Sequence, residues 1–335
     1  MKAIAPGKLI LSGEHAVVYG KPAIAMAVDR SAESIVLPGD AADEISFDLK
    51  DFSQHESFTV RALRALKSRV MKNYRMFLDG KLGIREVMYK PVELFQFAFI
   101  TILDGLHLKV ADGLRIQLHS NIPIGCGMGS SAATVLSVLR AIGHYFRVDF
   151  RPEWYQEYSL ETENMQHGHA SGVDTYISLH GGCARFQQGN AEKIPLPRLP
   201  MHLVNTGVPE STTGECVSRV RQNFSMSRIW DDFEVITRAM EKALADNDYE
   251  EIQRVIRENQ KLLSEIGVVP QKVQSFVSDI EKWGAAAKVC GAGSIRGEGA
   301  GIVLICSDVA PKKICDQYGY SLMSVRGEPL GARIV

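Results

Sequence analysis

The sequence predicts an α+β fold whose main sheet mixes parallel and antiparallel strands. Three observations lead to this class. Strand-like segments gather in the first part of the chain, helical spacing dominates residues 228–284, and strand-like segments return after residue 286. Strands and helices that are segregated along the chain favour α+β over a regularly alternating α/β fold. The chain has 335 residues, more than one hydrophobic core usually holds, so we expect two domains.

The boundary between the two domains is expected within residues 188–200. This segment contains Gly189 and three prolines, a composition typical of a connection rather than a regular element. We therefore divide the chain into residues 1–195 and residues 196–335, with the last strand allowed to return to the first domain.

The first domain is expected to begin with strands. Residues 2–12 alternate loosely between apolar and polar, and residues 45–49 alternate strictly, so both are predicted to be strands. Residues 17–28 are rich in Val, Ile and Ala and are interrupted by Gly20 and Pro22. We interpret them as a hairpin-like pair of strands.

The first helix is expected within residues 56–78, where apolar residues recur at three- and four-residue spacing. The apolar stripe consists of Leu63, Leu66, Val70, Tyr74 and Phe77. Basic residues lie mostly off this stripe. They form either a solvated helix face or a surface that attracts an anionic ligand, and the sequence leaves both interpretations open.

The remaining elements follow from periodicity and from glycine and proline positions. Further helices are expected at 91–106, 130–146, 152–167, 171–180, 230–246, 248–266, 270–283 and 309–316. Strands are expected at 113–119, 183–187, 201–206, 287–290 and 302–306, with two more at the end of the chain. Two glycine-rich segments interrupt this order, one before residue 130 and one between residues 290 and 302.

Composition and charge exclude several classes of protein. Lys and Arg total 38 against 39 for Asp and Glu, so the net charge of −1 lacks the basic excess of a dedicated nucleic-acid binder. No uncharged apolar stretch reaches about 18 residues, the length that predicts a membrane span. The six cysteines form no C-x-x-C pair, which argues against a zinc knuckle. We expect a cytoplasmic protein with free thiols and with no membrane or nucleic-acid partner.

The first glycine-rich segment has the pattern of a phosphate-binding loop. Three glycines at alternate positions precede Ser130 and Ser131, which lie at the start of a predicted helix. Glycines allow close approach of the backbone to a ligand, and the helix N-terminus presents free N–H groups to an anion. The alternative is a turn with a serine cap. The spacing of the P-loop and of the dinucleotide fingerprint is absent, so a nucleotide would be bound by another motif.

Three charged residues are candidates for chemistry. Glu163 and Asp174 lie eleven residues apart around Gly168, which is expected to break the helix, and both carboxylates can face one cleft. One carboxylate is suited to bind a hard cation such as Mg²⁺. The other is suited to orient or deprotonate a substrate hydroxyl. Lys8 can stabilise negative charge on a transferring group. Taken singly, each of these residues is also compatible with an ordinary surface position.

Together these segments resemble the GHMP kinase superfamily. Residues 5–20 resemble its first motif, in the form found in members that phosphorylate mevalonate. Residues 127–133 are similar to its second motif, with Met128 where Leu is usual, and residues 171–174 match the stretch that carries its aspartate. The resemblance implies a mixed-sheet N-terminal domain, a ferredoxin-like C-terminal domain with a helical insertion, and a cleft between them.

The resemblance also implies an activity and a set of roles. The activity is transfer of the γ-phosphoryl group of ATP to the C5 hydroxyl of mevalonate, a step of isoprenoid precursor biosynthesis. The loop implied to cradle ATP consists of Pro123, Ile124, Gly125, Cys126, Gly127, Met128, Gly129, Ser130, Ser131 and Ala132. Asp174 and Lys8 are implied as the catalytic pair, with Lys8 lowering the pKa of the substrate hydroxyl. Ser131 and Glu163 are implied as Mg²⁺ ligands, and a homodimer is implied as the assembly.

The acceptor end is less well defined by sequence. The resemblance places Lys8, Asp174, Glu14, His15 and Thr212 beside mevalonate, with Thr213 as a rival for Thr212. His15, if protonated, is a candidate partner for the substrate carboxylate. The alternatives are a kinase for phosphomevalonate or homoserine, a diphosphomevalonate decarboxylase, and a silent ligand sensor.

The chain departs from the family in the second glycine-rich segment, residues 291–301. The family has a compact glycine run there, whereas this chain inserts Arg296 and Glu298. Arg296 is either an additional phosphate contact or a surface residue paired with Glu298.

Overall fold

The computed structural model describes residues 1–39 and 41–335, which form two lobes, each built on its own sheet. The strands are β1 (Lys2–Ser12), β2 (Ala23–Pro38), β3 (Glu44–Leu49), β4 (Gln54–Thr59), β5 (Leu114–Ser120), β6 (Cys183–Gln187), β7 (Asn190–Ile194), β8 (Met201–Asn205), β9 (Ala286–Val289), β10 (Ile302–Cys306), β11 (Ser321–Ser324) and β12 (Arg333–Ile334).

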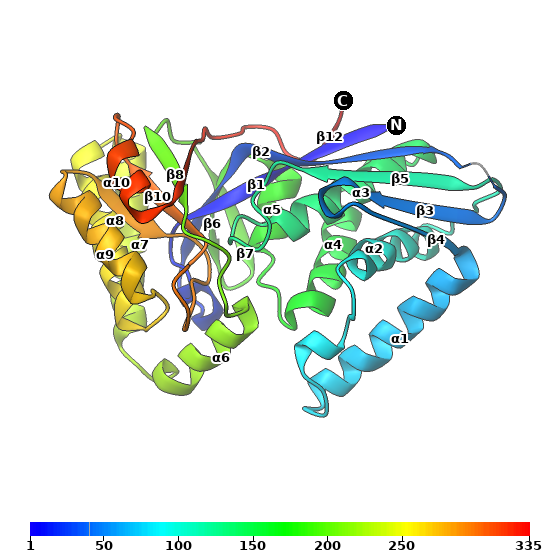
Figure 1. Cartoon of the computed structure of the whole chain (residues 1–335), viewed down its shortest axis with the longest axis horizontal. Helices are drawn as coiled ribbons and strands as arrows, with labels where there is room; N and C mark the ends of the chain where they lie inside the picture. The colour runs from blue at the N-terminus through cyan, green and yellow to red at the C-terminus, as the bar shows by residue number, and fades with distance from the viewer. Residues whose placement is uncertain (40) are drawn as a thin grey trace.

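Helices cover these strands at both ends of the molecule (Figure 1). They are α1 (Val60–Leu78), α2 (Val92–Gly105), α3 (Ser130–Tyr145), α4 (Pro152–His167), α5 (Val173–His180), α6 (Thr213–Phe224), α7 (Ile229–Asp246), α8 (Tyr249–Glu265), α9 (Gln271–Lys282) and α10 (Lys312–Tyr318). Short 3₁₀ helices are η1 (Ala16–Tyr19), η2 (Lys50–Phe52) and η3 (Ile84–Glu86). No helix in the described part of the chain is long and apolar enough to cross a bilayer.

The larger lobe is built on a mixed sheet, as the sequence predicts. Among the described residues its strand order is β12-β1-β2-β5-β3-β4, and β6 and β7 extend it from β2. The pair β3–β5 is parallel and the other pairs of this sheet are antiparallel. Helix α3 packs against β1 and β2, which places its N-terminus near the middle of the molecule.

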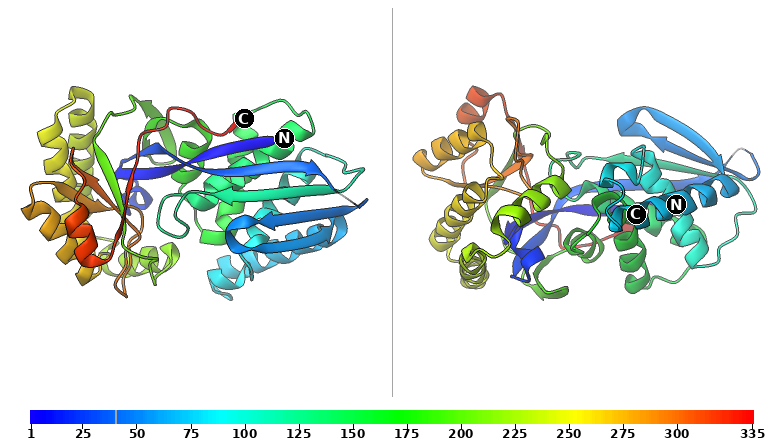
Figure 2. Two further views of the ribbon diagram at one scale, coloured as in Figure 1. Left: turned by 45° about the horizontal axis from the view of Figure 1, so that its top comes forward. Right: turned by 90° about the horizontal axis from the view of Figure 1, so that it is seen from below.

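The smaller lobe is an antiparallel sheet with helices on one side. Its described strands have the order β11-β8-β10-β9, and α8 and α9 pack on β9. Seen from below, α6 lies between this lobe and the larger one (Figure 2). One continuous core cluster contains Leu9 of β1, Leu136 of α3 and Leu304 of β10, so the hydrophobic core runs through both lobes.

One sequence interpretation of the early strands is wrong. Residues 17–28 do not form a hairpin: Ala16–Tyr19 is a 3₁₀ turn, and a single strand runs from Ala23 to Pro38. Gly20 adopts a left-handed conformation that ends the 3₁₀ turn, so the interruption interpreted as a hairpin turn precedes the strand instead of dividing it.

Two strands and one α-helix of the described residues were not expected from the sequence. Strand β7 lies inside the segment interpreted as a domain connection, β4 precedes α1, and α6 follows Thr212.

Part of the basic face of α1 is neutralised within the fold, because Arg64 and Lys67 both pair with Asp104 of α2.

Candidate active site

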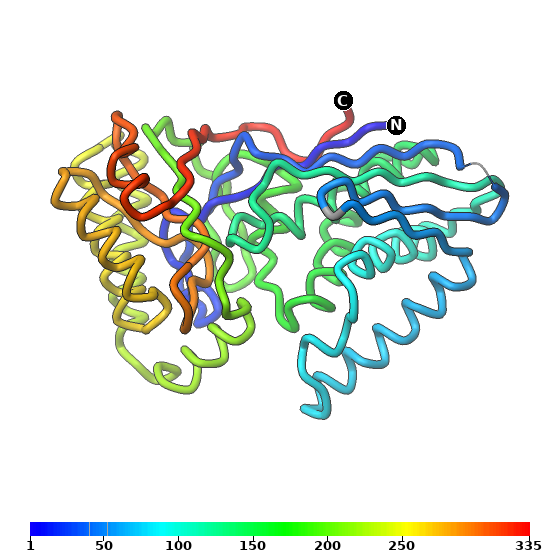
Figure 3. Tube along the Cα trace, in the orientation of Figure 1, coloured from blue at the N-terminus to red at the C-terminus, as the bar shows by residue number. Residues whose placement is uncertain are grey.

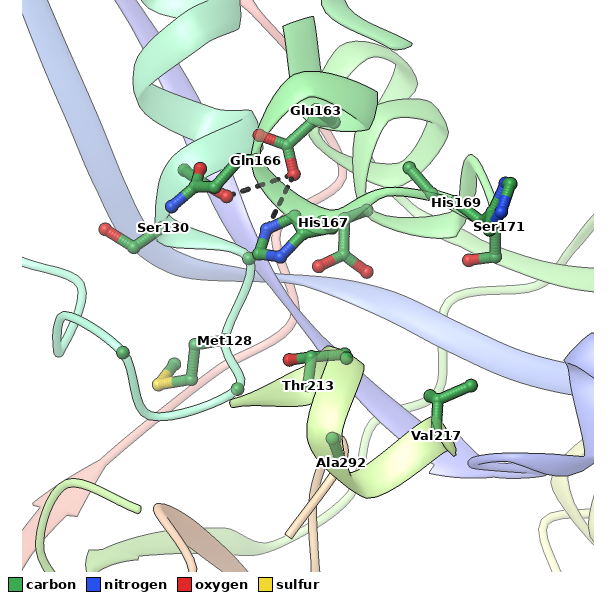
Figure 4. A pocket seen from close by; sticks show the side chains of 18 of the residues that line it. Met128, Ser130, Glu163, Gln166, His167, His169, Ser171, Thr213, Val217 and Ala292 are labelled. Atoms are coloured by element: carbon green, nitrogen blue, oxygen red, sulfur yellow. Dashed lines mark hydrogen bonds and ion pairs between the residues drawn. The ribbon is translucent and has the colours of Figure 1, made fainter. Parts of the chain in front are cut away.

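A cleft of about 1120 Å³ lies between the lobes and is lined by most of the residues singled out by sequence, but not by Pro123, Cys126, Ala132 or Thr212. In Figure 4, Glu163 and His167 lie on one wall, and Thr213, Val217 and Ala292 lie on the facing wall. Pockets that hold small ligands usually measure roughly 300–1,000 Å³. The cleft is therefore large enough for a nucleotide together with a small second substrate.

The loop before α3 has the backbone geometry of an anion cradle. Gly127 and Gly129 have φ angles of 85° and 69°, a left-handed region that other residues rarely adopt. A Cβ atom on Gly127 would lie 2.7 Å from the carbonyl oxygen of Cys290, so the loop is also closely packed on the smaller lobe. Helix α3 begins at Ser130, and its first N–H groups and dipole favour a negative charge at this point.

Lys8 is buried beneath this loop and points at Asp174. Its Nζ lies 3.2 Å from Oδ1 of Asp174 and donates a hydrogen bond of 3.0 Å to the carbonyl of Gly127. The Lys8 backbone N–H also donates to the carbonyl of Met128, which fixes strand β1 to the loop. Gly168 ends α4, and Asp174 lies in the first turn of α5 on the same cleft. One ammonium group is thus held between the loop and a carboxylate.

Glu163 is a buried carboxylate with unused binding capacity. Its Oε2 accepts a 3.0 Å hydrogen bond from Ser131. The same oxygen lies 3.5 Å from Nε2 of His167, a contact marked by a dashed line in Figure 4. Its Oε1 is buried without a partner. Burial, followed by the nearby charge of Asp174, raises the pKa of Glu163 to about 8. An orphaned carboxylate oxygen beside a serine hydroxyl is a donor set that fits a hard cation.

A complete metal cage is absent from the described residues. Within residues 1–39 and 41–335, no group of three or more His, Cys, Asp or Glu side chains is placed to hold an ion. Mg²⁺ commonly takes only one or two carboxylates from a protein and its other ligands from phosphate and water. The Ser131–Glu163 pair is consistent with that mode of binding.

The turn after β1 presents His15 to the cleft in a strained conformation. His15 has a φ angle of 59°, and its Nε2 lies 3.0 Å from the carbonyl oxygen of Ala292. Its Nδ1 is buried without a partner. Burial lowers the pKa of His15, so the structure favours the neutral ring over the protonated form that the sequence analysis considered for a substrate carboxylate.

Glu14, on the same turn, pairs with a residue that the sequence analysis missed. Its carboxylate forms an ion pair with Lys288 of β9, and the two side chains are 1% and 0% exposed. The sequence feature that could have revealed Lys288 is its place inside the apolar strand Ala286–Val289, because a charge buried there needs a partner.

The two candidate threonines have different surroundings. Thr212 is the N-cap of α6, and its hydroxyl is engaged with Glu215 in a capping box. Thr213 lines the main cleft, where Figure 4 shows it on the wall opposite Glu163. Of the two threonines, Thr213 is therefore the one whose hydroxyl is not engaged in capping α6 and lines the cleft.

The altered glycine-rich segment packs against the phosphate loop. Ile302 donates its N–H to the carbonyl of Cys126. Of the two interpretations left open for Arg296, the pairing with Glu298 does not occur: Arg296 lies 3.0 Å from Glu215, and Glu298 pairs with Lys272. Glu215 also pairs with Arg85 of η3, so these half-exposed charges connect α6 both to the 291–301 segment and to η3.

Comparison with known proteins gives the family. The sequence profile of the GHMP kinases N terminal domain matches residues 93–182. Mevalonate kinase of Pyrococcus furiosus is 30% identical over 308 residues, 87% of this chain and 86% of that protein. Mevalonate kinase of Thermococcus sibiricus is 28% identical over 307 residues, 87% of this chain and 86% of that protein.

The fold agrees with this result over the whole chain. The crystal structure of Methanococcus jannaschii mevalonate kinase superposes with a TM-score of 0.81 and 22% identity, covering 98% of each chain. The two sheets and the helices on them are therefore those of this group of enzymes. The family expected from the sequence motifs is confirmed: the chain belongs to the GHMP kinases, which are ATP-dependent small-molecule kinases.

Proposed function

We propose that this protein transfers the γ-phosphoryl group of ATP to the C5 hydroxyl of mevalonate. The observation that carries the reaction type is the Lys8–Asp174 pair directly beside the phosphate loop. The similarity to mevalonate kinases over 87% of the chain supports the acceptor, as does the Gly13-Glu14-His15 turn at the cleft. In this proposal the protein acts in isoprenoid precursor biosynthesis, in the cytoplasm and as a homodimer.

The geometry suggests how the chain's residues share the reaction. Residues 123–132 would bind the triphosphate through backbone N–H groups and the N-terminus of α3. Asp174 would orient the acceptor hydroxyl and accept its proton. Lys8, held by Gly127 and Asp174, would stabilise charge on the attacking oxygen and on the phosphoryl group. A loose phosphoryl-transfer transition state needs this positioning and charge neutralisation more than it needs a strong base.

Ser131 and Glu163 are the residues that would hold Mg²⁺. The cation would neutralise charge on the phosphate oxygens when bound. The free Oε1 of Glu163 is available for this role, and Ser131 already lies within hydrogen-bond distance of the same carboxylate.

The test of this function is ADP release from ATP with a panel of alcohols. Mevalonate, phosphomevalonate, homoserine and galactose are each assayed with and without Mg²⁺. We expect turnover that depends on both mevalonate and Mg²⁺. Turnover with another alcohol would reassign the acceptor within the family, and ATP binding without turnover of any of them would favour a silent sensor.

The neighbouring threonines give a prediction that separates a structural from a substrate-side role. Thr212→Ala removes the N-cap of α6 and should lower the free energy of unfolding by about 1 kcal/mol, with little change in KM for mevalonate. Thr213→Ala removes a hydroxyl that lines the cleft and should lower kcat/KM for mevalonate by about tenfold with little change in stability. Urea denaturation and steady-state kinetics measure both quantities. The reverse pattern would return the substrate-side role to Thr212.

A further inference from the structure

We propose that Lys288 is a positioning residue for the acceptor end of the site and that it acts through Glu14. This inference rests on the proposed function, because it assumes that the Gly13-Glu14-His15 turn contacts the acceptor. Lys288 is fully buried in β9 of the smaller lobe, whereas the turn follows β1 of the larger lobe. The residue therefore reaches the acceptor end from the opposite lobe.

All three donors of the Lys288 ammonium have acceptors. It donates to the carbonyl of Ile10 at 3.1 Å, to the carbonyl of Val289 at 2.9 Å and to Oε1 of Glu14. An ammonium group has three donors and no acceptor, so this set fixes its orientation completely. Ile10 is in the strand that carries Lys8, which connects the group to the catalytic end of β1.

A second residue of the smaller lobe holds the other side of the turn. Asn259 of α8 is fully buried, and its Nδ2 donates to Oε2 of Glu14 at 3.3 Å. Its Oδ1 accepts from the hydroxyl of Ser12 at 3.0 Å and from the N–H of Gly13 at 3.4 Å. Both carboxylate oxygens of Glu14 are thereby occupied, and three consecutive residues of the turn are tied to one amide.

This network supports a conformation that the local sequence does not favour. His15 follows Glu14 directly and has the left-handed φ of a residue that usually is glycine. Glu14 and His15 both line the cleft together with Lys8 and Asp174. A strained residue persists only where its surroundings determine its conformation, and here the surroundings are Lys288, Asn259 and the carbonyl of Ala292.

Stability alone gives little reason to bury this ion pair. Apolar residues of similar volume often replace a buried pair without loss, because desolvation of both charges offsets their attraction. The pair also lies at the site rather than elsewhere in the core. We therefore assign to it the placement of the turn relative to the acceptor, and no role in binding ATP.

The experiment compares Lys288→Met, Glu14→Gln and the double variant. We expect Lys288→Met to lower kcat/KM for mevalonate by about 100-fold while KM for ATP stays within about twofold, because only the acceptor is misplaced. Because Lys288 acts through Glu14, the double variant should have the kcat/KM of Glu14→Gln alone rather than the product of both losses. Lys272→Met, which breaks an exposed pair with Glu298, is the control and should match the unsubstituted enzyme.

Two results would overturn the inference. One is a kcat/KM for mevalonate in Lys288→Met close to that of the control, or parallel losses toward ATP and mevalonate. The other is a double variant in which the losses multiply. If Lys288→Met alone does not fold, the double variant contains no unpaired charge from this pair, and its comparison with Glu14→Gln decides the question.

The unsubstituted enzyme separates this inference from the proposed function. If it phosphorylates another alcohol of the panel instead of mevalonate, the proposed acceptor is wrong, and the same comparison with that alcohol tests the positioning role. If it phosphorylates none of them, both proposals fail together. If the unsubstituted enzyme phosphorylates mevalonate but the variants give either of the two overturning results, only the inference about Lys288 fails.

Discussion

Replacing Asp174 by asparagine is expected to lower kcat by roughly 10²- to 10⁴-fold, with little change in the affinity for ATP. The asparagine amide neither accepts the hydroxyl proton nor pairs with the ammonium of Lys8, which lies 3.2 Å from Oδ1 in the native site. The phosphate loop is untouched, so the nucleotide should still bind. Single-turnover kinetics measures the chemical step, and isothermal calorimetry measures ATP binding.

Lys8→Met tests the other half of the pair and should also lower kcat strongly. Lys2→Met is the matched control: Lys2 lies on the same strand and pairs with Glu33, but its side chain is 42% exposed. Near-normal rates in both Asp174→Asn and Lys8→Met would place the reacting centre elsewhere in the cleft.

Replacing Glu163 by glutamine should have opposite effects on catalysis and on stability. The pKa of Glu163 is about 8 in the folded protein against 4.5 for a free glutamate. Because this pKa is raised, the stability that depends on Glu163 is fully present below about pH 4.5, where the carboxyl is protonated in both the folded and the unfolded state. This stability is lost as the pH rises through 8. At pH 8 the loss amounts to about 4 kcal/mol, because one pKa unit corresponds to about 1.36 kcal/mol.

Glutamine stays neutral at every pH and avoids this loss. Without Mg²⁺, Glu163→Gln should therefore unfold at a higher temperature than the parent at pH 8, with little difference at pH 4.5. Its Mg²⁺-dependent turnover should fall on the order of 10²-fold, because a charged oxygen ligand is removed. Thermal melts in a chelator and ADP-release assays give the two readouts.

Glu157→Gln is the control for this prediction. Glu157 lies on the same helix α4 but is exposed, so its replacement should change neither quantity. A Glu163→Gln variant that melts at the parent temperature at pH 8 would show that Glu163 is not held in an unfavourable environment.

Much of the fold was predictable because its element ends have local causes. Helix α4 begins at Pro152 and ends before Gly168, and the predicted range was 152–167. Strand β1 was predicted for its observed length because its alternation is a local property, and it continues through Pro6 and Gly7, where its pairing with β2 shifts register. Helix α6 was missed because only two of its residues, Cys216 and Val220, are buried, which gives a weak apolar stripe.

The site likewise contains residues that local sequence predicts and pairs that it does not. The loop at Gly125–Ser131 and the residues Lys8, Glu163 and Asp174 belong to short motifs, and the structure brings them to one cleft. The partner of Glu14 was not predictable, because Lys288 lies 274 residues away and no local pattern relates the two. Arg296 likewise pairs across 81 residues with Glu215 rather than with its neighbour in sequence.

Strand β12 pairs with β1 through Ala3–Ile334 and Ile4–Arg333, so both ends of the described chain lie side by side, as Figure 3 shows. A short linker between them would therefore close the chain into a ring without moving any element. New ends could be opened at the exposed turn around Gly80, where a Cβ atom added to the glycine would meet no other atom within 4 Å.

The pairing of β12 with β1 also means that the last strand completes the first sheet. A fragment of residues 1–195 would expose the edge of β1, and co-expressed halves would have to reassemble to function.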